Sequence, residues 1–365
     1  MQQPILVLMA GGSGERFWPR SRRKYPKQLL KLLSDQSLLQ ESVARIRPLT
    51  EDRRLYVVTN RDYAADIRKQ LPFVPAQNVL VEPVGRNTAP CIALAAYHIA
   101  RAFPGEDPVL VFLPSDATIG NPEEMRQVLR AGVAVSAASE QGVLLGMKPT
   151  RPETGFGYIQ LGEQLGVREG KAYHRVVSFK EKPDLETARR YVAAGDYFWN
   201  AGIFIWKLSN LLAEFARHLP ELTQGLDRLR PFLDTAVASR ARAQKLAEIY
   251  PTLPAVSMDY GVLERTAGLL AFPADFGWDD LGSWNSLERY LAADENGNVV
   301  QGEFCGVATE GCIVYSPKKT VAALGVSDLV IVETEDVLLV CRKDQAADLK
   351  KLLTAVKEKN LHHLL

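Results

Sequence analysis

The stretch Pro4-Ile5-Leu6-Val7-Leu8-Met9-Ala10-Gly11-Gly12-Ser13-Gly14-Glu15-Arg16 joins an apolar run of strand length to a glycine-rich turn. A continuous apolar run that ends in glycines is typical of a buried parallel strand, which we predict over residues 5–9. The three glycines have no Cβ, so the backbone can come close to a ligand and offer its N–H groups. The stretch therefore predicts a strand followed by an anion-binding turn.

Two cations follow this turn, Arg16 at once and Lys27 eleven residues later. An anion in the turn would meet backbone donors and then two side-chain charges, which suits the phosphates of a nucleotide. Two familiar glycine loops are excluded: no Gly-Lys-Ser/Thr is present for a Walker A loop, and Phe17 stands where a dinucleotide fingerprint needs its third glycine. Without the cations, a plain strand-to-helix turn explains the glycines equally well.

Strand and helix patterns alternate over the first 150 residues. We predict strands at 5–9, 54–59, 78–81, 108–113 and 143–147, and helices at 37–46, 62–71, 91–101 and 122–139. Because β-α-β crossovers impose parallel pairing with helices on both faces, the expected fold is a doubly wound, Rossmann-like α/β domain with a mainly parallel sheet. Ligands of such sheets bind beyond the carboxyl ends of the strands. The glycine turn, residues 82–90 and Asp116 all follow predicted strands, so we expect them to share one crevice.

The pattern changes after residue 150 and again after residue 293. Strands at 154–159, 176–183, 199–206 and 269–273 predict a mixed sheet, with helices at 184–194, 208–249, 257–265 and 278–293. Beyond the turn-rich residues 294–298, short and evenly spaced strands at 311–315, 320–324, 329–334 and 337–341 precede a closing helix at 344–358. We therefore predict two domains, 1–293 and a small β-rich domain at 294–365.

Several separated motifs resemble the sugar-phosphate nucleotidyltransferase family. Ala10 to Pro19 together with Pro26-Lys27-Gln28 is similar to the family's signature, and Phe17-Trp18-Pro19 with the later motifs resembles the mannose-1-phosphate guanylyltransferases in particular. The resemblance covers about residues 4–290, and the C-terminal strands resemble the family's β-helix-like tail. It implies an enzyme that transfers GMP from GTP to mannose 1-phosphate, giving GDP-mannose and pyrophosphate with Mg²⁺ as cofactor.

The resemblance divides the nucleotide side of the site into a phosphate part and a base part. Arg16 and Lys27 would stabilise the charge on the leaving pyrophosphate. Glu82 would accept from the N–H groups of guanine; the alternative is a plain Glu-Pro turn with a helix cap at Asn87 or Thr88, and both can hold. The predicted nucleotide-binding set is Ala10, Gly11, Gly12, Gly14, Glu15, Arg16, Lys27, Glu82, Gly85, Asn87, Thr88, Ser115 and Asp116.

Asp116 and Asp280 are the predicted Mg²⁺ ligands, and with Arg16 and Lys27 they make up the predicted catalytic set. Asp116 ends an apolar strand, where an unpaired carboxylate would be costly to bury. The segment from Gly277 to Trp284 resembles the family's Gly-Trp-x-Asp-x-Gly-Ser/Thr-Trp, which selects Asp280 over its neighbour. The alternative for Asp280 is a helix N-cap. Ala117 departs from the family, whose members usually have His there.

The sugar-phosphate set rests on the resemblance and consists of Gly157, Glu181, Lys182, Asn200 and Gly202. Glu181 would accept from sugar hydroxyls, Lys182 would hold the sugar phosphate, and Asn200 can donate and accept at once. The alternative for residues 180–182 is a solvated charge run at a strand end. Asp259 belongs to a further family-like helix and is expected to support the site from behind.

Composition excludes several other classes of protein. A net charge of +1 over 365 residues gives no global basic field, so we expect no nucleic-acid partner. No apolar stretch approaches the ~20 residues of a membrane span. The four cysteines lack metal-ligand spacing and suit reduced thiols in the cytoplasm. No motif supplies Ser13 with the partners of a serine nucleophile.

Some alternatives stay open at this stage. Another hexose 1-phosphate or nucleotide would keep the same chemistry, and a non-catalytic sugar-nucleotide sensor would keep the same site. A dehydrogenase is disfavoured by the missing third glycine. Relatives with an isomerase activity carry a further cupin-like domain, for which a chain ending at Leu365 has no room, so a single activity is expected. The β-rich tail fits a homodimer contact and a self-contained core equally well.

Overall fold

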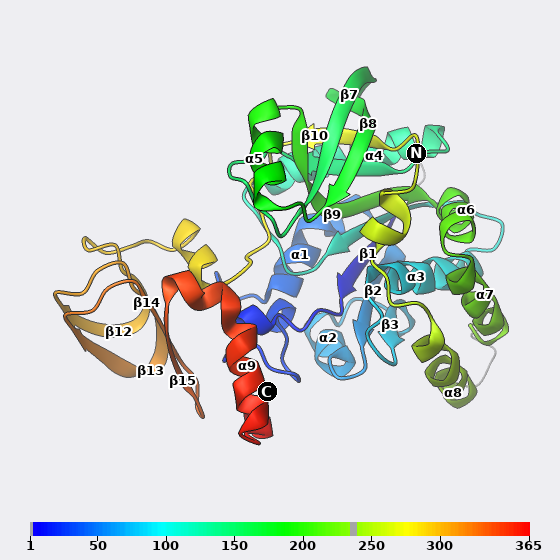
Figure 1. Ribbon diagram of the computed structural model, residues 1–365. Helices are drawn as coiled ribbons and strands as arrows, with labels where there is room; N and C mark the ends of the chain where they lie inside the picture. Colours follow the sequence, from blue (N-terminus) through cyan, green and yellow to red (C-terminus); the bar gives the residue numbers. More distant parts are fainter. Residues whose placement is uncertain (1–2, 234–238) are drawn as a thin grey trace. The chain divides into compact units, whose positions relative to one another are not determined.

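The computed structural model describes residues 3–233 and 239–365, which pack into two compact units. Unit 1 contains the chain up to Gly11, Val43–Ser115 and Ile119–Trp278, and unit 2 contains Gly12–Ser42, Asp116–Thr118 and Asp279–Leu365 (Figure 1). This division follows packing rather than chain order, and the domain boundary expected between residues 293 and 294 stays a prediction.

Unit 1 is built on a sheet whose first strands are parallel. These strands are β1 (Ile5–Ala10), β2 (Leu55–Asn60), β3 (Val79–Glu82) and β4 (Val109–Pro114), in the order β3-β2-β1-β4. Val7 pairs with Tyr56 on one side and with Phe112 on the other. The continuous apolar runs are buried on both faces, as parallel strands require. The doubly wound α/β prediction is confirmed.

The remaining strands turn this sheet into a mixed one. They are β9 (Tyr197–Lys207), β6 (Val143–Met147), β10 (Leu270–Ala274), β8 (Lys171–Glu181) and β7 (Gly157–Arg168), which continue the order from β4. β9 is antiparallel to both β4 and β6 and therefore separates two strands that run the same way. The alternation of strands and helices predicts parallel strands. It cannot reveal that β9, which comes later in the chain, inserts between β4 and β6.

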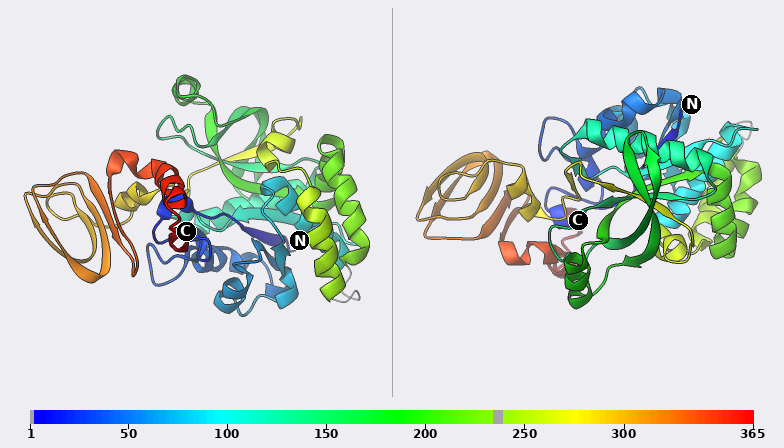
Figure 2. Two further views of the ribbon diagram at one scale, coloured as in Figure 1. Left: turned by 60° about the horizontal axis from the view of Figure 1, so that its bottom comes forward. Right: turned by 90° about the horizontal axis from the view of Figure 1, so that it is seen from above.

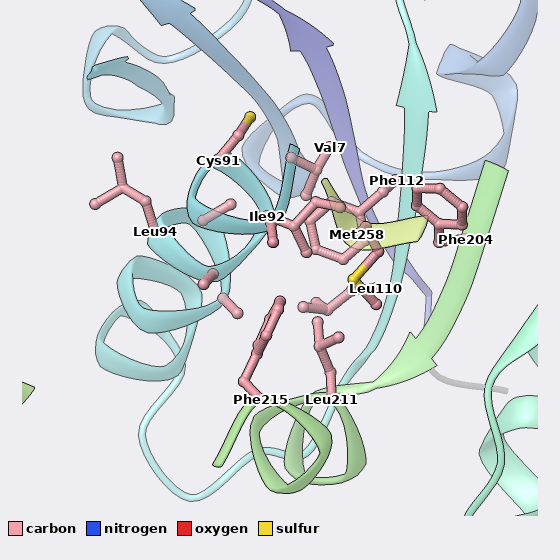
Figure 3. Close-up of a cluster of buried hydrophobic side chains, with 14 of the residues drawn as sticks. Val7, Cys91, Ile92, Leu94, Leu110, Phe112, Phe204, Leu211, Phe215 and Met258 are labelled. Atoms are coloured by element: carbon pink, nitrogen blue, oxygen red, sulfur yellow. The ribbon is translucent and has the colours of Figure 1, made fainter. Parts of the chain in front are cut away.

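Helices cover both faces of the parallel strands. On these strands, α3 (Thr88–Ala102) packs against β1 and β2, and α4 (Pro122–Ala138) packs against β4. The other helices up to residue 249 are α1 (Leu38–Ile46), α2 (Ala64–Gln70), α5 (Leu185–Ala194), α6 (Leu208–His218), α7 (Pro220–Leu229) and α8 (Ser239–Ile249). Ile5 and Val7 pack in one buried cluster with Ile92 of α3 (Figure 3). Leu6 and Leu8 point to the opposite face, as alternate strand residues must, and are also fully buried.

The hairpin of α6 and α7 lies beside α3, with α8 against α7 (Figures 1 and 2). Leu211 and Phe215, four residues apart on α6, enter the same cluster as α3. After α8 the chain returns along this cluster to a π-helical turn, Asp259–Leu263, whose Met258 cap and Val262 are fully buried. The described residues contain no helix that is long and apolar enough to cross a membrane.

Unit 2 carries the C-terminal β-rich region. Its strands are β12 (Val299–Val307), β13 (Ile313–Leu324), β14 (Leu329–Glu333) and β15 (Leu338–Arg342), followed by α9 (Leu349–Glu358). β12, β13 and β14 pair in parallel through short connections, which is the pairing of a β-helix, and β15 closes the set antiparallel. The predicted β-helix-like region is confirmed, although two of its predicted strands form the single strand β13.

The core of unit 2 joins the N-terminal loop to the C-terminal region. Phe17 and Trp18 share a buried cluster with Trp284 and Ile313. The Phe17 and Trp284 ring centroids are 5.3 Å apart, and Trp284 Nε1 donates to the Trp18 carbonyl at 3.1 Å. These contacts fix the loop that follows the glycine turn.

The helix predicted at residues 278–293 is shorter than expected. Trp278–Asp279 forms the two-residue strand β11, and Trp284–Arg289 forms a 3-10 helix. The other two-residue strand is β5 (Thr118–Ile119). Ser283 caps the 3-10 helix through reciprocal bonds with Ser286, so the helix begins six residues later than Trp278 and leaves Asp280 in a loop.

Candidate active site

The end of β1 is fixed just before the glycine turn. Ser115 Oγ donates to the Met9 carbonyl at 2.9 Å, and Thr59 Oγ1 donates to the Ala10 carbonyl at 2.9 Å. Ala10 is itself buried. The structure thus gives Ser115 a role in holding two neighbouring strand ends, and its role in nucleotide binding stays a prediction.

Glu82 is a buried carboxyl next to Gly11 in unit 1. It is 4% exposed and accepts a hydrogen bond of 2.5 Å from the Tyr250 hydroxyl at Oε1. A Cβ on Gly11 would lie 3.2 Å from Oε2, so the glycine leaves that oxygen uncovered by a side chain. Burial raises the pKa of Glu82 to about 7, and the Tyr250 bond opposes this only in part.

Residues 85–88 lead from Glu82 into α3. Asn87 has a left-handed φ of 72°, and its Oδ1 accepts from the Thr88 N–H at 2.8 Å, so the expected cap is present. Thr88 Oγ1 accepts from the Met258 N–H at 2.8 Å. Open space surrounds the missing Cβ of Gly85. The capping alternative is therefore correct for Asn87, and base recognition by this segment stays a prediction.

The predicted sugar-phosphate residues come together at the ends of β7, β8 and β9. Glu181 is buried, and Lys182 Nζ lies 2.9 Å from its Oε1. Asn200 Oδ1 accepts from the Gly202 N–H at 3.1 Å. Lys180 and Lys182 are half exposed, but the buried carboxylate between them is not part of a solvated charge run.

Gly157 is the glycine that this arrangement requires. A Cβ there would lie 2.5 Å from Glu181 Oε2 and 3.4 Å from the Asn200 Cβ. Lys182 and Gly202 also have left-handed φ angles, of 45° and 68°. Left-handed backbone costs an ordinary residue such as Lys182 about 1–3 kcal/mol and tends to occur at functional positions.

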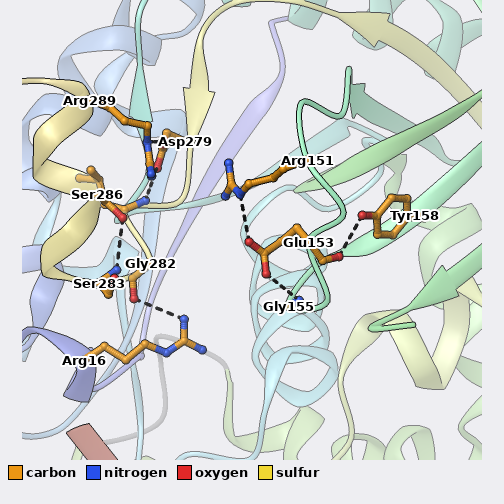
Figure 4. A network of polar contacts seen from close by, with 11 residues as sticks. Arg16, Arg151, Glu153, Gly155, Tyr158, Asp279, Gly282, Ser283, Ser286 and Arg289 are labelled. Atoms are coloured by element: carbon orange, nitrogen blue, oxygen red, sulfur yellow. Dashed lines mark hydrogen bonds and ion pairs between the residues drawn. The ribbon is translucent and has the colours of Figure 1, made fainter. Parts of the chain in front are cut away.

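The loop before β7 is ordered by its own polar contacts (Figure 4). Glu153 accepts from Arg151 at 3.2 Å and from the Gly155 N–H at 3.1 Å, and its carbonyl accepts from the Tyr158 hydroxyl at 2.9 Å. The Arg151 guanidinium also stacks over the Trp199 ring at 5.1 Å. The backbone leading into Gly157 is therefore held in place before any ligand arrives.

In unit 2, Lys27 is a buried cation with two oxygen partners. Its side chain is 7% exposed, and Nζ lies 3.0 Å from Asp116 Oδ2 and donates to the Asp280 carbonyl at 2.5 Å. The Phe17 ring lies 5.7 Å from Nζ. A buried ammonium needs such compensation, and here it comes from one of the predicted metal ligands and from the backbone of the other.

Gly14 allows Lys27 to reach this position. A Cβ on Gly14 would lie 2.2 Å from the Lys27 Cβ, and its φ is 64°, in the left-handed region. The Gly14 carbonyl also accepts from Ser21 Oγ at 2.7 Å. Gly12 differs, because nothing lies within 4 Å of the Cβ it would carry.

Arg16 is exposed, and its Nη1 donates to the Gly282 carbonyl at 3.3 Å (Figure 4). A Cβ on Gly282 would lie 3.0 Å from Asp280 Oδ2. Arg16 therefore contacts the loop that carries Asp280. Glu15 faces Lys350 at 3.9 Å between partly exposed side chains, which is a weak surface pair.

The structure separates the roles of Asp279 and Asp280. Asp279 forms an ion pair with Arg289 at 2.6 Å and accepts from the Leu281 N–H at 2.8 Å. Burial raises the pKa of Asp280; the charges of Asp279 and Asp116 raise it further, and Lys27 opposes them. The helix cap is Ser283, so the capping alternative is wrong for Asp280.

The carboxyls of Asp116 and Asp280 fit a divalent cation. The ionised form of Asp280 lacks full compensation where it stands, which a cation would supply. Among the residues that the structure describes, no three or more His, Cys, Asp and Glu side chains form a metal cluster. Two carboxylates are nevertheless the usual protein share of a Mg²⁺ site, where phosphate oxygens and water complete the coordination.

Comparison with known proteins decides the family. Residues 5–297 match the nucleotidyl transferase family, and residues 302–356 match the mannose-phosphate isomerase/GMP-like β-helix domain. The chain belongs to the nucleotidyl transferase family. Members of this family generally use a divalent metal ion.

Relatives match this nucleotidyl transferase over nearly its whole length. It is 36% identical to the mannose-1-phosphate guanylyltransferase of Escherichia coli K12, over 98% of this chain and 74% of the relative. It is 36% identical to the alginate biosynthesis protein AlgA of Pseudomonas aeruginosa, over 96% of this chain and 71% of the relative. A crystal structure described as a mannose-1-phosphate geranyltransferase from Thermus thermophilus superimposes with a TM-score of 0.85 at 35% identity, covering 98% of this chain and all of that one.

These findings confirm the resemblance inferred from the motifs. Sequence reasoning missed Tyr250 as the partner of Glu82 and gave no role to Glu264, whose Oε1 accepts from the Glu181 N–H at 3.0 Å. Each contact joins residues more than 80 positions apart, and no local pattern signals it. The binding and catalytic roles of the individual residues stay predictions.

Replacing Gly14 with alanine should destabilise the nucleotidyl transferase, whereas replacing Gly12 should not. Gly14→Ala adds a Cβ 2.2 Å from the Lys27 Cβ at a left-handed φ, and we expect a loss of roughly 2–4 kcal/mol in the free energy of unfolding. Gly12→Ala has open space and should change it by less than about 1 kcal/mol. Denaturant unfolding of both variants measures the difference; equal stabilities would contradict the packing argument.

Replacing Glu82 with glutamine should remove a pH-dependent loss of stability. The pKa of Glu82 is about 7 in the folded protein, against an ordinary value of 4.5 in the unfolded chain. Between pH 4.5 and 7 the folded protein therefore binds more protons than the unfolded chain. Wild-type stability should therefore fall, relative to Glu82→Gln, as the pH rises from about 4.5 to 7. The difference in free energy of unfolding between Glu82→Gln and the wild type should change by about 3 kcal/mol between pH 4.5 and pH 8. Denaturant unfolding at pH 4.5, 6, 7 and 8 tests this, and a constant difference contradicts it.

Proposed function

We propose that this nucleotidyl transferase transfers GMP from GTP to mannose 1-phosphate and releases pyrophosphate and GDP-mannose. The observation that carries the choice of substrates is the similarity, over 98% of the chain, to an enzyme named mannose-1-phosphate guanylyltransferase. The Thermus relative is described with a geranyl group instead. Backbone amides, cations and carboxylates suit a nucleotide better than an apolar geranyl chain, which favours guanylyl transfer here.

The proposed reaction needs no covalent enzyme intermediate. Mannose 1-phosphate is mostly dianionic at neutral pH, because its second pKa is about 6. One of its phosphate oxygens attacks the α-phosphorus of GTP and forms a new P–O bond. The bond from that phosphorus to the bridging oxygen of the β-phosphate breaks, and pyrophosphate leaves with the electron pair. Catalysis then depends on positioning and on charge stabilisation.

The phosphate groups of GTP are assigned to the glycine turn and its cations. Backbone N–H groups of Gly11, Gly12 and Gly14 offer donors, and Arg16 and Lys27 balance the charge of the leaving pyrophosphate. The buried position of Lys27 supports this, because its side chain is 7% exposed and cannot be screened by solvent as a surface lysine would be.

Asp116 and Asp280 are the residues that would hold the divalent cation, and we propose Mg²⁺. The hard carboxylate oxygens and the small number of protein ligands favour this ion. When bound, it neutralises phosphate charge. Lys27 orders the site by holding the Asp116 carboxylate and the Asp280 carbonyl at 3.0 and 2.5 Å.

Glu82 is the residue we assign to guanine. Tyr250 occupies Oε1, so Oε2 is the oxygen left to accept from a guanine N–H group. Guanine N1–H and N2–H are donors, whereas adenine presents an acceptor at N1. A buried carboxyl group left unpaired by the wrong base gives strong discrimination. Gly85, Asn87 and Thr88 supply the backbone around the base in this proposal.

The hexose phosphate is assigned to the residues gathered around Gly157. Glu181 accepts from sugar hydroxyls, Lys182 binds the phosphate, and Asn200 and Gly202 complete the set. The buried Glu181 carboxylate beside Gly157 supports this assignment, since a Cβ there would lie 2.5 Å from its Oε2. A buried acceptor with a fixed position suits a sugar hydroxyl.

The same proposal locates the reaction in the cytoplasm. All four cysteines, which lie within the described residues, are free thiols, and Cys91 and Cys312 are buried. Reduced thiols support a reducing compartment. The homodimer contact of the β-rich tail stays a prediction.

Nucleotide preference tests the proposed substrates. With mannose 1-phosphate and Mg²⁺, pyrophosphate release from GTP should exceed that from ATP, UTP or dTTP by at least about 100-fold in kcat/KM, as expected when a wrong base leaves a buried carboxyl unpaired. Glucose 1-phosphate is the matched sugar comparison. A preference for another base would overturn the guanylyl assignment, and no release with any pair would overturn the enzymatic one.

Metal removal tests the assignment of Asp116 and Asp280. A chelator should abolish pyrophosphate release, and added Mg²⁺ should restore it. Asp280→Asn keeps the shape of the side chain but removes its charge, so kcat should fall by roughly 100-fold or more. Asp336→Asn, which alters the ion pair between a half-exposed carboxylate and Arg22 in the same unit, is the control and should stay near wild type. Full activity of Asp280→Asn would contradict the metal role.

A further inference from the structure

A continuous segment outside the predicted site forms hydrogen bonds to both the base segment and the sugar-phosphate set of unit 1. We call Tyr250–Glu264 the strap. It runs from a 3-10 helix at Tyr250–Thr252 to the π-helical turn Asp259–Leu263. Apart from Asp259, its residues had no role in the sequence prediction.

The strap first contacts the start of the segment assigned to the base. The Tyr250 hydroxyl donates to Glu82 at 2.5 Å. The Leu253 carbonyl then accepts from Arg86, whose Nε lies at 2.8 Å and whose second guanidinium nitrogen also donates. Both ends of residues 82–86 are therefore tied to the strap.

The next strap residues hold the start of α3. The Val256 carbonyl accepts from the Ala89 N–H at 3.1 Å, and the Met258 N–H donates to Thr88 Oγ1 at 2.8 Å. The first N–H groups of a helix lack partners within the helix. The strap supplies one of those partners and fixes the point at which residues 82–88 become helical.

The last strap residues reach the sugar-phosphate set. Asp259 Oδ1 accepts from Asn200 Nδ2 at 2.9 Å, and Glu264 Oε1 accepts from the Glu181 N–H at 3.0 Å. Since Asn200 Oδ1 already accepts from the Gly202 N–H, the Asp259 and Gly202 bonds together determine which way the Asn200 side-chain amide faces.

The π-helical turn is what brings both carboxyls to this side. The Glu264 N–H donates to the Asp259 carbonyl at 3.0 Å, a bond between residues five apart. Residues joined by such a bond stand one turn apart, on the same side of the helix. In an α-helix, residues five apart point about 140° away from each other. π-turns are rare and frequently occur at functional sites.

The core holds the strap rigidly. Tyr250, Met258 and Val262 are fully buried, and Met258 packs in the cluster of Val7 and Phe112 (Figure 3). Contacts from such a segment are pre-formed, and pre-formed supporting contacts hold the side chains of a site in the productive geometry.

We propose that the strap is the positioning element of the reaction, in which Tyr250 orients Glu82 for the nucleotide, and Asp259 and Glu264 orient Asn200 and Glu181 for the sugar phosphate. This inference rests on the proposed function for the identity of the two ligands. The strap residues touch neither ligand; they act through residues that do.

The charge of Asp259 agrees with a supporting role. Burial and then the neighbouring Glu181 charge raise its pKa to about 7, while Lys182 and the Asn200 bond oppose this. A carboxyl that is partly neutral competes less for the Lys182 ammonium. Lys182 thus stays paired with Glu181 while Asp259 still accepts from Asn200.

Steady-state kinetics tests the two ends of the strap separately. Asp259→Leu removes the acceptor of Asn200 and should raise KM for mannose 1-phosphate about tenfold with KM for GTP within about twofold. Asp259→Asn keeps an acceptor and should restore most of the effect. Tyr250→Phe removes only a hydroxyl and should raise KM for GTP instead. Asp227→Leu, which loses the Tyr97 hydroxyl bond elsewhere in unit 1, is the matched control and should change neither.

Amide hydrogen exchange tests the strap without any substrate. Glu264→Leu removes the acceptor of the Glu181 N–H and should speed its exchange about tenfold or more. Asp259→Leu frees the Asn200 side chain, whose Oδ1 is the acceptor of the Gly202 N–H, and should speed exchange of that N–H by a similar factor. Exchange rates equal to those of the wild type in both variants would overturn the proposal. An equal rise in the KM for mannose 1-phosphate and the KM for GTP in Asp259→Leu would also overturn it. If the wild type turns over neither substrate, the proposed function fails, and exchange alone then decides whether the strap positions these residues.

Discussion

The burial of the Lys27 ammonium is the constraint on which unit 2 depends. A charge with 7% side-chain exposure must be compensated locally, and the Asp116 carboxylate and the Asp280 carbonyl do so. Bringing Lys27 there requires a backbone without a side chain at Gly14, whose Cβ would overlap it. The loop between them is held by Phe17 and its neighbours in the same core as the C-terminal strands. The stability of this core therefore also secures the electrostatics of the site proposed for the phosphates.

Unit 1 also buries ionisable groups, but these are carboxyl groups rather than an ammonium group. Glu82 and Glu181 are carboxyls in buried positions, and each lies against a glycine, Gly11 and Gly157 respectively. The glycine keeps one carboxyl oxygen clear of side chains, and a neighbouring group holds the other oxygen: the Tyr250 hydroxyl for Glu82 and the Lys182 ammonium for Glu181. A fixed and only partly satisfied acceptor is what selective recognition of a hydrogen-bond donor needs. Burial costs folding energy here and would provide specificity in the proposed function.

The sequence was sufficient where the signal is local. The apolar run at 143–147 coincides with β6, because a buried strand between polar turns leaves little choice. Glycines after β1 and the Asp280 motif identified the two loops around Lys27 for the same reason. The order of β9 between β4 and β6 was out of reach, since insertion depends on sheet packing. The helix expected from residue 278 was wrong because Ser283 and Ser286 cap it later than helical spacing suggests. Tyr250 gave no signal at all, as its partner stands 168 positions earlier.

The strap illustrates why supporting residues are harder to infer than the residues they support. Helical periodicity assigns Asp259 and Glu264 to different faces, so a sequence reading gives them different environments. The one-residue widening of the π-turn cancels that difference and directs both carboxyls at β8 and β9. Such a turn is less favourable than α-helix and persists only where the surrounding structure compensates it. Here the buried Met258 and Val262 provide that compensation. Asn200 and Glu181 are thus held by the core behind them as well as by the strands that carry them.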